Sequence, residues 1–109
     1  MPPDPAVVQA RLTLLQYLYR EAVRGLGQAL ELARQPPLVA EEKEVLFGEV
    51  ERAVWAFPDG FFVDPPADDA GWEERAGDDP RVRDAMDRGV TRILENRRDA
   101  AKAFGRADS

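Results

Sequence analysis

An apolar stripe with helical spacing runs along the first part of the chain. Its members follow one another at alternating steps of four and three residues: Val8, Leu12, Leu15, Tyr19, Ala22, Leu26, Ala29 and Ala33. Steps of this kind place the side chains on one face of an α-helix. Asp4 and Pro5 form a helix start, because the aspartate accepts from free backbone amides and proline fits the first turn. Since Pro36-Pro37 ends the pattern, the sequence predicts a helix over residues 5–34.

Two further amphipathic segments are predicted as helices over residues 38–57 and 80–104. They carry apolar stripes at Leu46, Val50, Ala53 and Phe57, and at Val82, Met86, Val90 and Ile93. The break at Pro36-Pro37 is short, so the first two helices should turn back on one another as an antiparallel hairpin. A chain of 109 residues has room for one core. The predicted fold is therefore a single all-α domain over 1–109, a long antiparallel helical hairpin plus a third helix.

Residues 58–79 leave the helical period. The segment is rich in proline, glycine and aspartate, and it opens with the turn signal Pro58-Asp59-Gly60. It is longer than most connections between helices, yet it holds Phe61, Phe62 and Trp72. We expect a long acidic loop joining the second and third helices. It is either a functional or partly disordered loop or a segment held in place by its aromatic residues, and we favour the second, with Phe61 and Phe62 packing over the end of the hairpin.

Negative charge is concentrated in this predicted loop. The net charge is −6, and residues 58–80 hold eight acidic residues against Arg75 alone, a local charge of −7. Like charges repel unless a basic surface or a cation neutralises them. The alternative is a solvated loop that only aids solubility. We predict that the segment meets a basic surface of a protein partner through Asp59, Phe61, Phe62, Asp64, Asp68, Asp69, Trp72, Glu73 and Glu74.

The same charge distribution bears on nucleic acids. A strongly acidic segment repels the phosphate backbone, which argues against direct nucleic-acid binding despite the arginine-rich third helix. It also allows an alternative function, an inhibitor that mimics nucleic acid and occupies the basic site of its target.

The first helix is apolar over more than one face. Val7, Leu14 and Leu18 lie off the main stripe, and the helix is longer than the second, which would leave its far end poorly covered. A plain three-helix core could account for these residues. We nevertheless predict a homodimer, with the interface formed by Leu12, Leu15, Tyr19, Ala22, Leu26 and Ala29.

The chain contains no cysteine and no histidine. Thiol nucleophiles, thiolate metal sites and imidazole bases are therefore excluded. We expect a non-enzymatic interaction or regulatory protein with no catalytic residue and no cofactor.

Two carboxylate pairs provide an alternative. Glu41-x-x-Glu44 and Asp84-x-x-Asp87 each place two acids one helical turn apart. In this respect the sequence resembles the all-helical nucleoside triphosphate pyrophosphohydrolases of the MazG type, which hold Mg²⁺ with an E-x-x-E pair on one helix and an E-x-x-D pair on the next. The resemblance implies a Mg²⁺-dependent hydrolase with these four residues as ligands. The second pair here is Asp-x-x-Asp and lies farther along the chain than in that family.

The sequence also bears on location. No apolar run approaches the roughly 20 residues that a membrane-spanning helix needs. The N-terminal residues 1–5 lack the basic start and apolar region of a signal peptide. We expect a cytoplasmic protein that does not enter the membrane.

Overall fold

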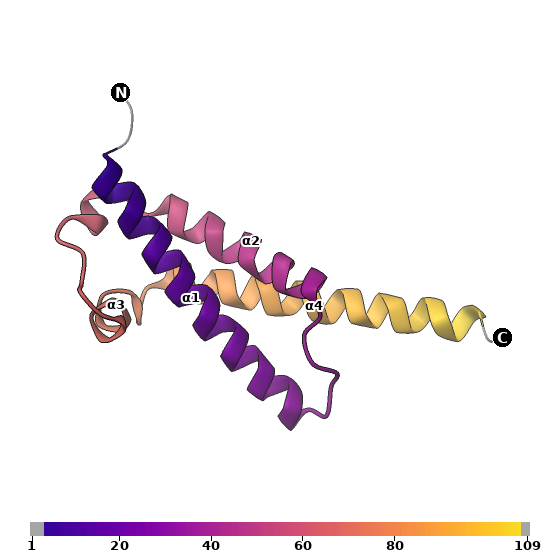
Figure 1. Cartoon of the computed structure of the whole chain (residues 1–109). Coiled ribbons are helices and arrows are strands. Elements are labelled where there is room, and N and C mark those ends of the chain that lie inside the picture. Colours follow the sequence, from indigo (N-terminus) through magenta and orange to yellow (C-terminus); the bar gives the residue numbers. More distant parts are fainter. Residues whose placement is uncertain (1–3, 108–109) are drawn as a thin grey trace.

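The computed structural model describes residues 4–107, with side chains described up to residue 103, and all regular secondary structure in this part of the chain is helical (Figure 1). It contains four α-helices and one 3-10 helix: α1 (Pro5–Leu32), α2 (Ala40–Ala56), η1 (Asp59–Phe62), α3 (Asp69–Ala76) and α4 (Pro80–Ala107). The prediction of an all-α fold is confirmed. Within residues 4–107, no helix has both the length and the apolar character needed to cross a membrane.

The long helices begin and end where local chemistry favours it. The Asp4 carboxylate accepts from the Ala6 amide at 2.9 Å, and Asp79 caps α4 in the same way through the Arg81 amide at 2.9 Å. α1 ends at Leu32 because Arg34 enters the left-handed region at φ 55° and the Gln35 amide donates to the Leu30 carbonyl at 2.8 Å. Local capping therefore fixes these ends.

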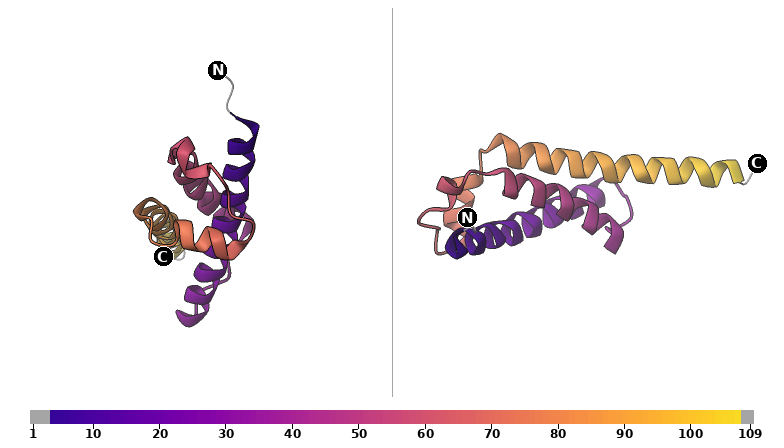
Figure 2. Two further views of the ribbon diagram at one scale, coloured as in Figure 1. Left: turned by 90° about the vertical axis from the view of Figure 1, so that its left-hand side faces the viewer. Right: turned by 90° about the horizontal axis from the view of Figure 1, so that it is seen from above.

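α2 is the central element of the fold. It packs against α4 more extensively than against α1, whereas α1 and α4 contact each other only slightly. In Figures 1 and 2, α2 runs back alongside α1, and the C-terminal part of α4 extends beyond both helices. The shape is elongated, 59 × 32 × 22 Å along its principal axes. Leu14, Leu46 and Ile93 bring one fully buried side chain each from α1, α2 and α4 to the shared core.

A close approach and a buried carboxylate fix the α2–α4 packing. Gly89 lies against Leu46, and a Cβ at this glycine would stand 2.7 Å from Leu46 Cδ1. Beside this contact Glu49, only 5% exposed, accepts from three arginines. The N–O distances are 3.4 Å to Arg52, 3.3 Å to Arg88 and 3.1 Å to Arg92. Because three cations surround the carboxylate, its burial is electrostatically compensated.

The segment predicted as a loop over residues 58–79 contains η1 and the eight-residue helix α3. Asp68 accepts from the Gly71 amide at 2.9 Å and thus caps α3. Trp72 and Ala76, one turn apart, are each 1% exposed and anchor this helix in the core. The prediction of a continuous loop is wrong at residues 69–76, because one cap and two buried side chains suffice to form a helix too short to show a periodic pattern.

Candidate functional site

The acidic residues between α2 and α4 fall into two groups. Asp59 pairs with Arg11 of α1 at 2.5 Å, Asp69 pairs with Arg20 of α1, and Asp79 pairs with Arg81 at 2.7 Å. The others are exposed and form no ion pair with the side chains of residues 4–103. We call this second group the acidic end; it consists of Asp64, Asp68, Glu73, Glu74 and Asp78.

Arg75 does not neutralise the acidic end by pairing with one of its carboxylates. Its guanidinium donates to three backbone carbonyls, those of Phe61 at 3.3 Å, Val63 at 3.4 Å and Asp64 at 3.1 Å. This arginine therefore holds residues 61–64 against α3. With five carboxylates and one guanidinium, the acidic end and Arg75 together carry a charge of −4.

The aromatic residues predicted to contact a partner are largely internal. Phe62 and Trp72 are each 1% exposed, and Phe61 is half-buried against Phe57 with ring centroids 4.4 Å apart. The prediction that Phe62 and Trp72 contact a partner is therefore corrected, because both rings are enclosed by the chain's own core. The exposed apolar side chain at this place is Val63, 59% exposed, which the sequence reasoning missed.

A small pocket lies beside the acidic end, between α1, α3 and α4. Tyr17, Leu18 and Glu21 line it from α1, Glu73 and Ala76 from α3, and Val82, Arg83 and Met86 from α4. Its volume is about 280 Å³. Burial raises the pKa of the Tyr17 hydroxyl, and the negative charges of Glu73, Glu21 and Asp69 raise it further, whereas Arg20 lowers it. The phenol therefore stays protonated and lies in a negative potential.

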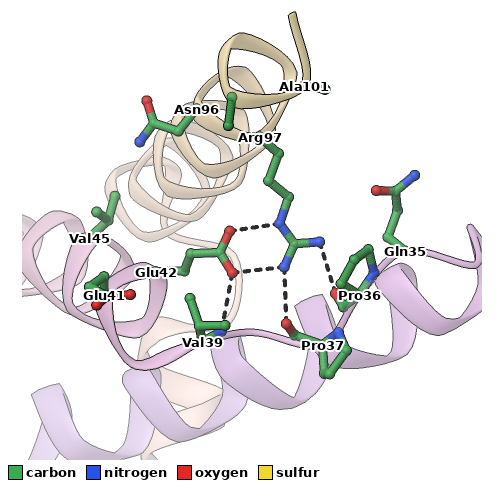
Figure 3. A pocket seen from close by; sticks show the side chains of 11 residues that line it. Gln35, Pro36, Pro37, Val39, Glu41, Glu42, Val45, Asn96, Arg97 and Ala101 are labelled. Atoms are coloured by element: carbon green, nitrogen blue, oxygen red, sulfur yellow. Dashed lines mark hydrogen bonds and ion pairs between the residues drawn. The ribbon is translucent and has the colours of Figure 1, made fainter. Parts of the chain in front are cut away.

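A wider groove of about 580 Å³ lies where the linker 33–39 and the start of α2 face α4 (Figure 3). Arg97 crosses it, donating to the two Glu42 carboxylate oxygens at 2.6 and 2.7 Å and to the Pro36 and Pro37 carbonyls at 2.8 and 3.1 Å. Glu42 also accepts from the Val39 amide at 3.1 Å. The Arg97 hydrogen bond is the main cause that lowers the pKa of Glu42. Because these charged groups satisfy one another, this contact fastens α4 to the linker.

The four residues of the pyrophosphohydrolase alternative do not come together. Glu41 lines the groove of Figure 3, and Glu44 lies beside Tyr19 and Phe47. Asp84 and Asp87 are exposed on α4, where Asp87 lines a further hollow with Arg88. Residues 4–107 contain no group of three or more acidic side chains positioned to hold a metal ion. The carboxylate pairs on α2 and α4 therefore do not converge as a magnesium site would require.

The residues predicted as a dimer interface are divided between the core and the surface. Leu15, Ala22 and Leu26 are buried within the chain itself. Tyr19 is half-buried and packs edge-on against Phe47 of α2, with ring centroids 5.2 Å apart. Of the six residues, only Leu12 and Ala29 are exposed. The predicted interface is corrected on this point, because the inward half of the stripe is already covered.

Comparisons with protein-family models, with curated proteins and with solved structures found no match. Two features of the described residues can still engage another molecule. One is the acidic end, whose carboxylates have no basic side chain of residues 4–103 within ion-pairing distance. The other is the adjoining pocket, to which the acidic end contributes Glu73.

Proposed function

We propose that the protein is a non-enzymatic interaction or regulatory protein whose acidic end meets a basic surface on a protein partner. One observation supports this proposal above all. Asp59, Asp69 and Asp79 pair with arginines of the same chain, whereas the five exposed carboxylates of the acidic end pair with no arginine or lysine of residues 4–103. A concentrated surface charge of one sign speeds association with a surface of the opposite sign and selects against partners of like charge.

The chemistry of the adjoining pocket also favours binding over catalysis. A general base must lose its proton near the working pH. The Tyr17 hydroxyl has its pKa raised by burial and neighbouring carboxylates, so it holds its proton more firmly than a free tyrosine does. Arg83, the cation in the lining, is exposed at the rim. The arrangement suits the recognition of a positively charged group.

A nucleic-acid-mimicking inhibitor is a narrower form of the same proposal, in which the basic surface of the partner is one that normally binds nucleic acid. We do not propose self-association through α1, because Leu15, Ala22 and Leu26 are buried in the chain's own core.

The test compares two variants of equal net charge. In the first, the acidic end is neutralised as Asp64→Asn, Asp68→Asn, Glu73→Gln, Glu74→Gln and Asp78→Asn. Asparagine at Asp68 keeps a side-chain oxygen for the α3 cap. In the control, five exposed carboxylates elsewhere are neutralised: Glu31, Glu41, Glu44, Asp84 and Asp87. Each tagged protein is used to capture partners from its native host, and the affinity for any captured protein is measured by surface plasmon resonance.

We expect the control to bind its partner like the wild type and the acidic-end variant to bind at least about tenfold more weakly, mainly through slower association. Wild-type binding should also weaken as salt rises, since exposed charges are screened. Equal binding by both variants would show that position does not matter and would refute the proposal. If the captured partner binds nucleic acid, competition between that nucleic acid and this protein tests the inhibitor form.

A further inference from the structure

The pocket between α1, α3 and α4 combines an apolar floor with an acidic rim. Leu18, Ala76 and Val82 are buried and form the floor together with the half-buried Met86. Glu21 and Glu73 stand at the rim beside the Tyr17 ring. This is the arrangement that suits a ligand with an aliphatic stem and a cationic head.

The size of the pocket limits what can enter it. Its volume of about 280 Å³ lies just below the range of roughly 300–1,000 Å³ that is usual for pockets holding drug-sized ligands. A nucleotide or a large cofactor is therefore too big to be enclosed, whereas one amino-acid side chain fits the dimension.

The charged groups around the pocket leave one carboxylate open. Glu21 is paired with Arg24 at 2.5 Å, and Asp69 is paired with Arg20. Glu73 forms no ion pair with any side chain of residues 4–103. After burial, the charge of Glu73 is the largest cause that raises the pKa of Tyr17, and the neighbouring carboxylates together outweigh the opposite effect of Arg20. Arg83 is the one positively charged residue in the lining of this pocket, and it would repel a cationic ligand.

We propose that this pocket accepts one lysine or arginine side chain from the basic partner, with the stem against Leu18, Val82 and Met86 and the cation at Glu73. The guanidinium of Arg20 already lies 5.8 Å from the centroid of the Tyr17 ring, so the cation of the partner is held by Glu73 and not by this ring. The inference rests on the proposed function and deepens it: a single anchoring side chain fixes the register of the partner, while the rest of the acidic end contributes long-range attraction.

The first test uses small molecules that imitate the side chain. Binding of n-butylguanidinium, n-butylammonium and neutral n-butanol is followed by NMR through shifts of the Tyr17 ring and Met86 methyl signals. Both cations should shift these signals saturably, and the alcohol should do so at least about threefold more weakly, since it lacks the ion pair. Cation shifts no stronger than those of the alcohol, or spread over the whole acidic surface, would overturn the proposal.

Matched variants separate the pocket from general charge. Glu73→Gln should weaken cation binding about threefold or more, whereas the neighbouring Glu74→Gln, which removes the same charge outside the lining, should leave it unchanged. Arg83→Ala should tighten binding, because it removes the like charge at the rim. Equal effects of the Glu73 and Glu74 variants would refute the pocket.

The same pair of variants is then applied to the captured partner. Glu73→Gln should weaken the complex more than Glu74→Gln does. If the two act equally while full neutralisation of the acidic end abolishes binding, the pocket inference fails and the proposed function stands. If full neutralisation has no effect, the proposed function itself fails.

Discussion

Replacing Trp72 by alanine tests whether α3 is packed into the core or lies on the surface with its tryptophan available to a partner. Trp72 is 1% exposed, so its removal takes nearly the whole ring out of a packed interior. A tryptophan buries about 150–250 Å². At roughly 25 cal/mol per Å² this corresponds to about 4–6 kcal/mol, in line with the 3–5 kcal/mol usual for such truncations. Since domains are stable by about 5–15 kcal/mol, the loss should reach roughly a quarter of the total or more.

The control is Trp55→Ala on α2. This ring is 43% exposed, and its guanidinium neighbour Arg11 lies 5.2 Å from the ring centroid. Less surface is lost from the interior, so the expected cost is roughly half that of Trp72→Ala or less. Urea denaturation followed by far-ultraviolet circular dichroism measures both. If Trp72→Ala shifts the midpoint no more than Trp55→Ala does, the burial argument for α3 is wrong and the ring is open to partners.

Two further changes test the core and the α4 contact. Leu15→Glu should destabilise the fold by about 3 kcal/mol or more, because Leu15 is only 4% exposed and the substitution would bury an unpaired charge. A variant that stays fully folded and differs from the wild type only in its molar mass by light scattering would instead support the dimer interface. The hydrogen bond from Arg97 is the main cause that lowers the pKa of Glu42 in the folded state. The pair should therefore stabilise the fold at pH values above the unfolded pKa of about 4.3. This stabilisation should be lost as the pH falls through the lower folded-state pKa. Glu42→Gln should therefore reduce the melting temperature at neutral pH but flatten its decline in acid, and parallel curves for wild type and variant would contradict this reasoning.

The long helices were predictable because their signals are local and repeated. The stripe that includes Leu15 and Leu26 covers many turns, and Asp4 and Asp79 mark helix starts by their own capping chemistry. α3 has a capping residue, Asp68, but no repeated apolar pattern. It spans two turns, and its only buried residues are Trp72 and Ala76, so its formation depends on contacts with distant elements.

The ion pairs were not predictable for a related reason. Arg11 and Asp59 are 48 positions apart, and Arg20 and Asp69 are 49 apart. A count of charges along the sequence treats all the acidic residues of 58–79 alike. It carries no information on the fold, which places α1 beside some of them. The same limit affected the predicted dimer interface, since periodicity identifies the apolar face of α1 but does not show which residues of that face α2 and α3 will cover.

The consequence for binding follows from where the carboxylates are held. A disordered acidic loop would lose conformational entropy when a partner ordered it. Here residues 59–75, which carry most of the acidic end, are already held in place. The contacts that hold them are the Arg11–Asp59 and Arg20–Asp69 pairs, the buried Trp72 and the hydrogen bonds from Arg75 to three carbonyls. A basic partner that meets Glu73 and Glu74 on α3 thus meets preorganised charges. Most of the electrostatic attraction then contributes to affinity, because little of it is offset by the cost of ordering the segment.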